Sequence, residues 1–327
     1  NISNYRNLAD SVRDAGVFEN VMVYNIKEIY PDKNSVALAR RLLGDKDIFN
    51  KSYEVYLFAN LDHGASGIYR MLRKRNRHIK AIMFEDGYAS YSGWYSDFLT
   101  MYGSVPYDGN VCKRLIFKTW FHRLVDNVFC SVEEILVFNS SIMIYKPSFR
   151  VENMKPIDVK NSKLVETYNR IFKYDPSVDS YKEPIIFFEE SYYADGYNVN
   201  DVEIVEKIAN IVGKEKLFVK IHPRNPENRF EKLGYKTNKN TSIPWEVICM
   251  NIDLSEKTLI TIASVAAIVP ATMFGKKYNG ILLMKMIPDD SCLKKNITNL
   301  YEKMCEEHSS LHLVKSMQEL EECISKK

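Results

Sequence analysis

Residues 217–225 read LFVKIHPRN, an apolar run with an abrupt polar ending. An apolar run of this length that is bounded by a turn signal is typical of a short buried strand. His222 and Pro223 would then lie at the carboxyl end of a strand, where open α/β sheets bind their ligands. The stretch therefore predicts an α/β fold with a histidine at its binding edge.

Strands and helices are expected to alternate along the rest of the chain. The expected strands are residues 21–24, 53–59, 79–84, 135–138, 184–188, 217–221, 259–262 and 281–284. The expected helices are residues 7–17, 36–43, 66–75, 111–125, 163–172, 202–212, 265–274, 297–307 and 317–324. This order favours mostly parallel sheets with crossover helices.

The length of 327 residues suits two domains of roughly 150 residues each. A polar segment in the middle of the chain is the best candidate for a linker. We therefore expect one Rossmann-like domain over residues 1–155, a linker over 156–182 and a second Rossmann-like domain over 183–327. Two such α/β domains with a cleft between them make the GT-B architecture.

The composition excludes several classes of protein. A net charge of +3 is too small to indicate a nucleic-acid partner. The 6 cysteines are scattered singly without a CxxC pair, which is typical of reduced thiols in a cytoplasmic protein. No apolar stretch reaches the length of about 18 residues that a transmembrane helix needs.

The apolar run at residues 79–84 ends in Glu85-Asp86-Gly87. A carboxylate at a strand end that faces a cleft can take a proton from an acceptor hydroxyl, which makes Asp86 a candidate general base. Glu85 would point to the other side of the strand. The alternative is an ordinary Asp-Gly turn, which is common at strand ends. The presence of the His-Pro pair later in the chain favours the catalytic interpretation.

His222 has two candidate roles, as a general acid or as a cationic donor to a leaving phosphate. Lys220 and Arg224 flank it and raise the local positive potential, which favours an anionic leaving group. Pro223 offers an apolar face on which a base can rest. The alternative is a buried histidine with satisfied hydrogen bonds and no role in chemistry.

Ser264 follows the expected strand at 259–262 and begins an expected helix. Helix N-termini bind phosphate through free backbone N–H groups and the dipole, and a serine there adds its hydroxyl. An ordinary N-cap is the alternative and is compatible with anion binding. Glu246 is a candidate for accepting both ribose hydroxyls, the alternative being a solvated glutamate at a helix start.

Two further patterns have less specific interpretations. Asp45-Lys46-Asp47 matches a DxD metal motif but lies in a polar loop after a helix, and we interpret it as solvated. A basic cluster is typical of a solvated helix face and is also a candidate contact for anionic lipid head groups or an anionic glycan. Its members are Arg70, Arg73, Lys74, Arg75, Arg77, His78 and Lys80.

Together, Glu85-Asp86-Gly87 and His222-Pro223 resemble the (D/E)DG and HP motif pair of bacterial sialyltransferases with the GT-B fold. These include the lipooligosaccharide sialyltransferases of family GT52 and the related GT38, GT80 and GT97 groups. Residues 243–246 (IPWE) are similar to their ribose-contacting segment. Ser264 resembles the serine of their phosphate-binding Ser-Ser/Thr motif, although Val265 stands in place of the second hydroxyl residue.

The resemblance implies an inverting, metal-independent transfer of sialic acid from CMP-sialic acid to a glycan hydroxyl, in capsule or lipooligosaccharide biosynthesis. Asp86 would deprotonate the acceptor, and His222 would stabilise the departing phosphate. No metal or further cofactor is implied. We expect a galactose-terminated acceptor and a cytoplasmic protein that contacts the inner membrane face through the basic cluster. The expected donor-binding residues are Lys220, Pro223, Glu246 and Ser264.

Other functions remain open at this stage. A phosphotransferase of the same fold that uses CDP-glycerol would also place a histidine at a strand end. A non-catalytic protein that binds a nucleotide or glycan would bind the donor without turnover. A structural surface protein is disfavoured by the scattered cysteines and the lack of a signal peptide.

Overall fold

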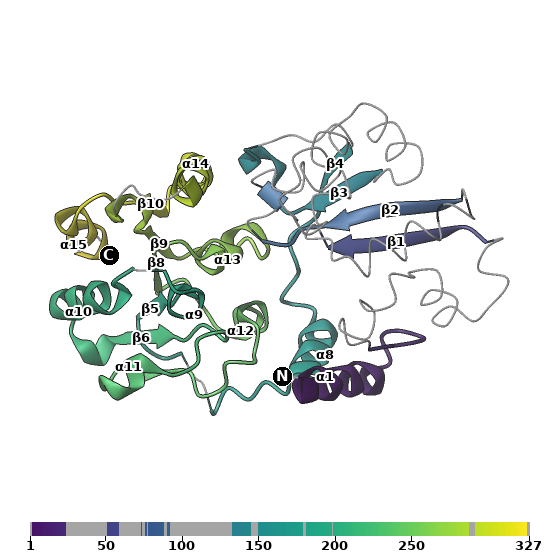
Figure 1. Cartoon of the computed structure of the whole chain (residues 1–327), viewed down its shortest axis with the longest axis horizontal. Helices are drawn as coiled ribbons and strands as arrows, with labels where there is room; N and C mark the ends of the chain where they lie inside the picture. Colours follow the sequence, from purple (N-terminus) through teal and green to yellow (C-terminus); the bar gives the residue numbers. More distant parts are fainter. Residues whose placement is uncertain are drawn as a thin grey trace, which may run out of the picture. The chain divides into compact units, whose positions relative to one another are not determined.

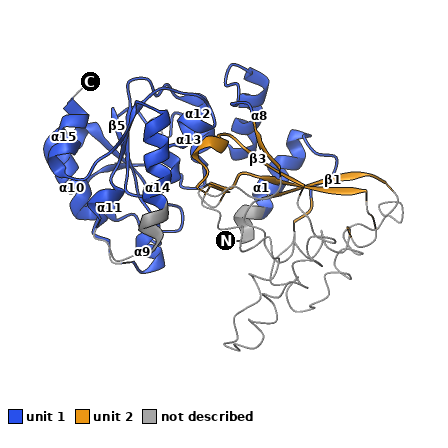
Figure 2. Ribbon diagram, turned by 90° about the horizontal axis from the view of Figure 1, so that it is seen from above, with its two compact units in different colours: residues 1–21, 155–327 blue, residues 22–154 orange. Residues whose placement is uncertain are grey.

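The computed structural model describes residues 2–23, 51–58, 73, 76, 78–87, 90–91, 133–144, 150–178, 181–197, 199–287 and 292–325. The chain forms two compact units, one of residues 22–154 and a larger one of residues 1–21 and 155–327 (Figures 1 and 2). Each unit contains a parallel sheet, so the predicted α/β class is confirmed. No helix in the described part of the chain is long and apolar enough to cross a membrane.

The described part of the smaller unit contains a sheet with the strand order β1-β2-β3-β4, all parallel. Its strands are β1 (Tyr53–Phe58), β2 (Ile79–Phe84), β3 (Glu134–Val137) and β4 (Arg150–Asn153). β2 is inside the sheet and four of its six residues are buried, which explains its mostly apolar sequence. β4 lies at an edge, reads RVEN and is half-exposed, so no apolar run revealed it in the sequence.

The larger unit contains a parallel sheet with the strand order β10-β9-β8-β5-β6-β7. Its strands are β5 (Ile185–Phe188), β6 (Leu217–Lys220), β7 (Lys236–Thr237), β8 (Thr258–Thr261), β9 (Asn279–Leu282) and β10 (Leu311–Leu313). This is the 3-2-1-4-5-6 order of a doubly wound sheet, read from β7 to β10. The order reverses between β5 and β8, and that switch point positions the site described below.

The larger unit contains the α-helices that the structure describes, several of which begin at a capping side chain. They are α1 (Ile2–Ala15), α8 (Ser162–Phe172), α9 (Tyr192–Asp195), α10 (Asp201–Val212), α11 (Arg229–Lys232), α12 (Trp245–Asn251), α13 (Val269–Thr272), α14 (Cys292–Glu307) and α15 (Met317–Ser325). The side chain of Asn200 caps α10 by accepting the N–H of Glu203. Gly213 ends that helix with φ +90°, a conformation that favours glycine.

The first helix, α1, belongs to the larger unit and packs against α8 (Figure 1). The guanidinium of Arg170 in α8 donates to the carbonyl of Ala15 at 3.2 Å, which ties the two helices together. The sequence analysis assigned α1 to the first domain and the segment containing α8 to a linker. Their pairing joins segments about 150 positions apart, and no local pattern signals such a contact.

Two expected elements differ in the structure. Residues 21–23 are not a strand. Residues 265–274 do not form one helix but a three-residue 3₁₀ turn, Val265–Ala267, followed by the short helix α13. Pro270 explains the break, because proline has no N–H to bond within a helix and is tolerated only in its first turn. The expected helices at 36–43 and 111–125, and most of that at 66–75, lie outside the described residues.

Candidate functional site

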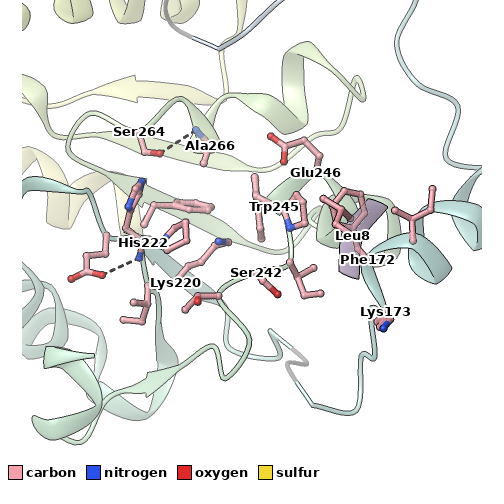
Figure 3. Close-up of a pocket in the computed structure, with 18 of the residues that line it drawn as sticks. Leu8, Phe172, Lys173, Lys220, His222, Ser242, Trp245, Glu246, Ser264 and Ala266 are labelled. Carbon is pink, nitrogen blue, oxygen red and sulfur yellow. Dashed lines mark hydrogen bonds between the residues drawn. The ribbon is translucent and has the colours of Figure 1, made fainter. Parts of the chain in front are cut away.

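A pocket of about 760 Å³ lies at the carboxyl edge of the larger unit's sheet (Figure 3). Its walls come from the ends of β5 and β6, the turn after β8, the start of α12, and the helices α1 and α8. The first three of these flank the switch point, where doubly wound sheets bind their ligands. In the view of Figure 3, His222 and Ser264 lie on one side of the pocket, and Leu8, Phe172 and Lys173 on the other.

Five residues that the sequence analysis assigned to donor binding or catalysis all line this pocket. They are Lys220, His222, Pro223, Glu246 and Ser264. They come from three elements that are separated by up to about forty positions, and the sheet topology brings them to one place. This convergence is a property of the fold, since the strand order fixes which loops meet.

His222 is held by two hydrogen bonds, one from its backbone and one to its ring. Its backbone N–H donates to Oε2 of Glu189 at 3.0 Å. Its Nδ1 accepts the backbone N–H of Arg224 at 3.2 Å. In the neutral ring the proton is therefore on Nε2, and that N–H is available to a ligand in the pocket.

The charge state of His222 differs from the protonated form that both expected roles, general acid and cationic donor, require. Burial, then the positive charges of Arg224 and Lys220, lower the pKa of His222 to about 4. Asp195 opposes this shift only in part. The guanidinium of Arg224 also bonds Asp195 at 3.2 Å, which offsets some of its charge. In the ligand-free protein at neutral pH, His222 is thus a neutral donor and not a cation.

Ser264 is presented by a turn rather than by a long helix. Its hydroxyl oxygen accepts the N–H of Ala266 at 3.3 Å, so its hydrogen can be donated to a ligand. Its own backbone N–H donates to Oγ1 of Thr261 at 2.9 Å and is therefore used within the protein. Because only a 3₁₀ turn follows, an anion here would depend on the hydroxyl more than on a helix dipole.

Trp245 and Phe188, which line the pocket, belong to an aromatic cluster. Trp245 is buried and packs edge-on against Phe188, with ring centroids 4.8 Å apart. Tyr181 lies between Trp245 and Phe218, at 5.9 and 4.6 Å. Glu246 is the next residue after Trp245, in the first turn of α12, so this packing also fixes its position.

Two pocket residues present the remaining candidate contacts. Pro223 is exposed, so its ring is accessible to a base. Lys220 is the last residue of β6 and only 9% of it is accessible to solvent. A lysine this buried places its charge at the pocket and not at the protein surface.

Two carboxylates directly after β5, Glu189 and Glu190, were not among the predicted site residues. Glu189 is buried, lines the pocket and accepts the N–H of His222. Glu190 bonds the turn that presents Ser264. The signal was present in the order Phe188-Glu189-Glu190, in which two acidic residues end a wholly apolar strand.

Asp86 lies in the smaller unit, directly after β2, and is exposed. Its backbone N–H donates to the hydroxyl of Ser90 at 2.6 Å, and Gly87 continues the loop at φ +53°. Glu85 points inward, where it accepts the N–H of Phe138 at 2.8 Å and the hydroxyl of Tyr91. Burial raises the pKa of Glu85. The role of Asp86 as a general base stays a prediction.

The less specific motifs fall mostly outside the described residues. This applies to Asp45-Lys46-Asp47 and to Arg70, Lys74, Arg75 and Arg77 of the basic cluster. Arg73 is described, and its guanidinium lies 3.6 Å from a carboxylate oxygen of Glu133 and donates to the carbonyl of Ile79. Its charge is thus directed into its own unit.

Comparisons with known proteins agree with the resemblance seen in the motifs. The model of a family described as alpha-2,8-polysialyltransferase (POLYST) matches residues 18–277, which include both motifs and most of the pocket. No curated protein matches the sequence.

A similar solved structure is that of an alpha/beta-galactoside alpha-2,3-sialyltransferase from the luminous marine bacterium Photobacterium phosphoreum. It is 12% identical in sequence, with a TM-score of 0.50 over 88% of this chain and 85% of that one. At this identity the likeness concerns the fold.

Proposed function

Since this chain belongs to the alpha-2,8-polysialyltransferase family, we propose that it transfers sialic acid from CMP-sialic acid to a glycan hydroxyl with inversion and without a metal. Family membership makes the protein a sialyltransferase, which uses a nucleotide-sugar donor and a glycan acceptor. The observation that supports the donor assignment best is the convergence of His222, Ser264 and Glu246 on one pocket at the switch point.

We place the CMP moiety in this pocket. Nε2–H of His222 and the hydroxyl of Ser264 would donate to the phosphate, and Lys220 would supply positive charge beside it. Glu246 would accept the ribose hydroxyls. The exposed ring of Pro223 would support the cytosine. Fixed donors of this kind stabilise a departing phosphate without a metal ion, because they are already oriented when the charge develops.

The proposed reaction is a single displacement at the anomeric carbon of sialic acid. The bond from that carbon to the phosphate oxygen breaks, and CMP leaves with the electron pair. The acceptor oxygen forms the new bond on the opposite face, and its proton passes to the carboxylate of Asp86. This assignment requires the two units to act as the two halves of a GT-B enzyme, with Asp86 brought to the donor by the smaller unit.

The linkage named for the family bears on the acceptor. The family's description names an α-2,8 linkage, which joins one sialic acid to another and favours a sialylated acceptor. A galactose-terminated glycan, expected from the motifs, is the second candidate.

The test is to incubate the protein with CMP-sialic acid and matched galactosides and sialosides. CMP release and any new glycoside would be followed by mass spectrometry. We expect a product one or more sialic acid units heavier than the acceptor. Release of CMP without a glycoside in any arm, or turnover with CDP-glycerol instead, would refute the transfer of sialic acid. Binding of CMP without turnover would indicate a non-catalytic protein.

A further inference from the structure

The two carboxylates that end β5 reach toward different neighbouring loops. β5 lies between β6 and β8, and these strands carry the His222 and Ser264 loops. Glu189 is directed to the β6 side, where it accepts the N–H of His222 at 3.0 Å and the guanidinium of Arg229 at 2.9 Å. Its position is therefore fixed by charge as well as by burial.

Glu190 is directed to the β8 side. Its Oε1 accepts the hydroxyl of Thr261 at 2.8 Å and the backbone N–H of Ala263 at 2.9 Å. Its backbone carbonyl accepts the side-chain amide of Asn225 at 2.9 Å, which links it to the loop after His222. Glu190 thus connects the end of β5 to both loops that line the pocket.

A relay leads from Glu190 to Ser264. The hydroxyl of Thr261 has one hydrogen, and it is donated to Glu190. The oxygen lone pairs of Thr261 are then left to accept the backbone N–H of Ser264, which they do at 2.9 Å. Without the carboxylate, the Thr261 hydroxyl could rotate and donate elsewhere. The backbone of Ser264 would then lose its fixed orientation.

We propose that Glu190 is a positioning residue that holds the turn from Thr261 to Ser264, so that the Ser264 hydroxyl meets the phosphate of the donor. Glu189 does the same for His222, and the pair sets the spacing of the two phosphate donors. This rests on the proposed function, since it assigns the phosphate of CMP to that end of the pocket. Glu190 itself touches neither donor nor acceptor.

Four variants separate the relay from a general loss of structure. Glu190→Ala removes the acceptor, and Thr261→Val removes the hydroxyl at nearly constant shape. Glu190→Gln and Thr261→Ser keep an acceptor and a hydroxyl at the same places. Glu183→Ala is the matched control, because Glu183 precedes the amino end of β5, and its largely buried carboxylate pairs with the exposed amine of Lys236.

CMP affinity would be measured by calorimetry on the full chain. We expect Glu190→Ala and Thr261→Val each to weaken CMP binding about tenfold, the effect of one lost positioning hydrogen bond. The double variant should be no weaker than the poorer single one, because both break the same relay. Glu190→Gln, Thr261→Ser and Glu183→Ala should stay within about threefold of the unchanged protein.

Hydrogen exchange of the ligand-free protein gives a second readout. A non-specific loss of stability would raise exchange rates throughout the sheet, whereas loss of the relay would raise them in one segment. We expect faster exchange in residues 259–266 of Glu190→Ala and Thr261→Val, with the rest of the sheet unchanged. Unchanged affinity and exchange in these variants would overturn the inference, as would additive losses in the double variant. Failure of the wild-type protein to bind CMP would refute the proposed function. The exchange data alone would then show whether the relay from Glu190 to Ser264 exists.

Discussion

The neutrality of His222 determines what this residue can contribute to catalysis. With a pKa of about 4 in the free protein, the imidazole is neutral throughout the range from pH 6 to pH 8. It can still donate from Nε2 to a phosphate, and the approach of that anion would itself favour protonation. His222 is therefore better suited to stabilising the leaving group than to titrating in the working pH range.

Replacing His222 with alanine should lower kcat/KM by about 10²–10³, the usual cost of one fixed donor to developing charge. We also expect His222 to cause no step in the profile of kcat/KM against pH between pH 6 and 8. The profiles of the wild-type protein and of this variant should therefore have the same shape in that range. His78→Ala is the control, since His78 is exposed and distant in sequence from the pocket. A step near pH 6.5 that depended on His222 would contradict the neutral assignment.

Glu190 should make the stability of the protein depend on pH. Burial raises the pKa of Glu190 to about 7, although hydrogen bonds from the backbone of Ala263, the hydroxyl of Thr261 and the backbone of Ser264 oppose the shift. Asp201 from α10 adds a like charge, and the hydroxyls of Tyr192 and Tyr301 are the other titratable groups coupled to it. The folded protein thus binds this proton more tightly than the unfolded chain.

The sign follows from the linkage between proton binding and folding. The stability that Glu190 contributes is fully present below its unfolded pKa near 4.5 and is lost as pH rises through 7, at about 1.4 kcal/mol per unit. Glu190→Gln cannot ionise, so its thermal midpoint relative to the unchanged protein should rise from pH 5 to pH 8. Calorimetric scans at both values test this, and an equal difference at both would refute the raised pKa.

At the scale of elements, Glu246 lies in the first turn of α12, where we expect it to bind the ribose and to stabilise the start of the helix. Glu246→Ala should weaken CMP about tenfold through loss of the ribose contact. It should cost at most about 1 kcal/mol of stability, the usual worth of an acidic residue at a helix start. Glu203→Ala in the first turn of α10 is the control for the second effect, to which it adds the loss of bonds to Asn200 and Lys207. Unchanged CMP affinity in Glu246→Ala would remove this residue from the site.

The interior strands were predictable because their short, continuous apolar sequences are typical of buried strands. β5 reads IIFF, and β6 reads LFVK; all four residues in each strand are buried. Their predicted ends were within one residue of the observed ones. β4, β7 and β10 were not predicted, because strands at or near a sheet edge are short and carry too few apolar residues to form a run.

The pocket was predictable only in part, for a different physical reason. His222, Glu246 and Ser264 follow strands or begin helices, and such positions are visible in a sequence. The roles of Glu189 and Glu190 depend on which strands flank β5, which no local pattern contains. The pairing of α1 with α8 likewise depends on contacts between distant segments.

At the scale of the whole molecule, the residues that we assign to the donor all belong to one unit, and Asp86 belongs to the other. The larger unit supplies its own positive groups and hydroxyl donors to the pocket. Turnover should therefore persist in EDTA with less than about a twofold loss, because fixed donors take the place of a metal. Loss of activity that Mg²⁺ or Mn²⁺ restored would contradict this and would make Asp45 and Asp47 the leading candidates for a metal site.

The division of labour between units gives the sharpest test of Asp86. Asp86→Asn should lower the transfer rate by about 10²–10⁴, the range for loss of a general base. Its CMP affinity should stay unchanged, because all the residues assigned to CMP lie in the larger unit. Initial rates and CMP calorimetry on the same preparation measure both, with Glu54→Gln as an exposed carboxylate control on β1 of the same unit. Loss of CMP binding in Asp86→Asn would place Asp86 at the donor and not at the acceptor. Full activity would show that another group takes the proton, and the assignment of a separate unit to each substrate would then fail.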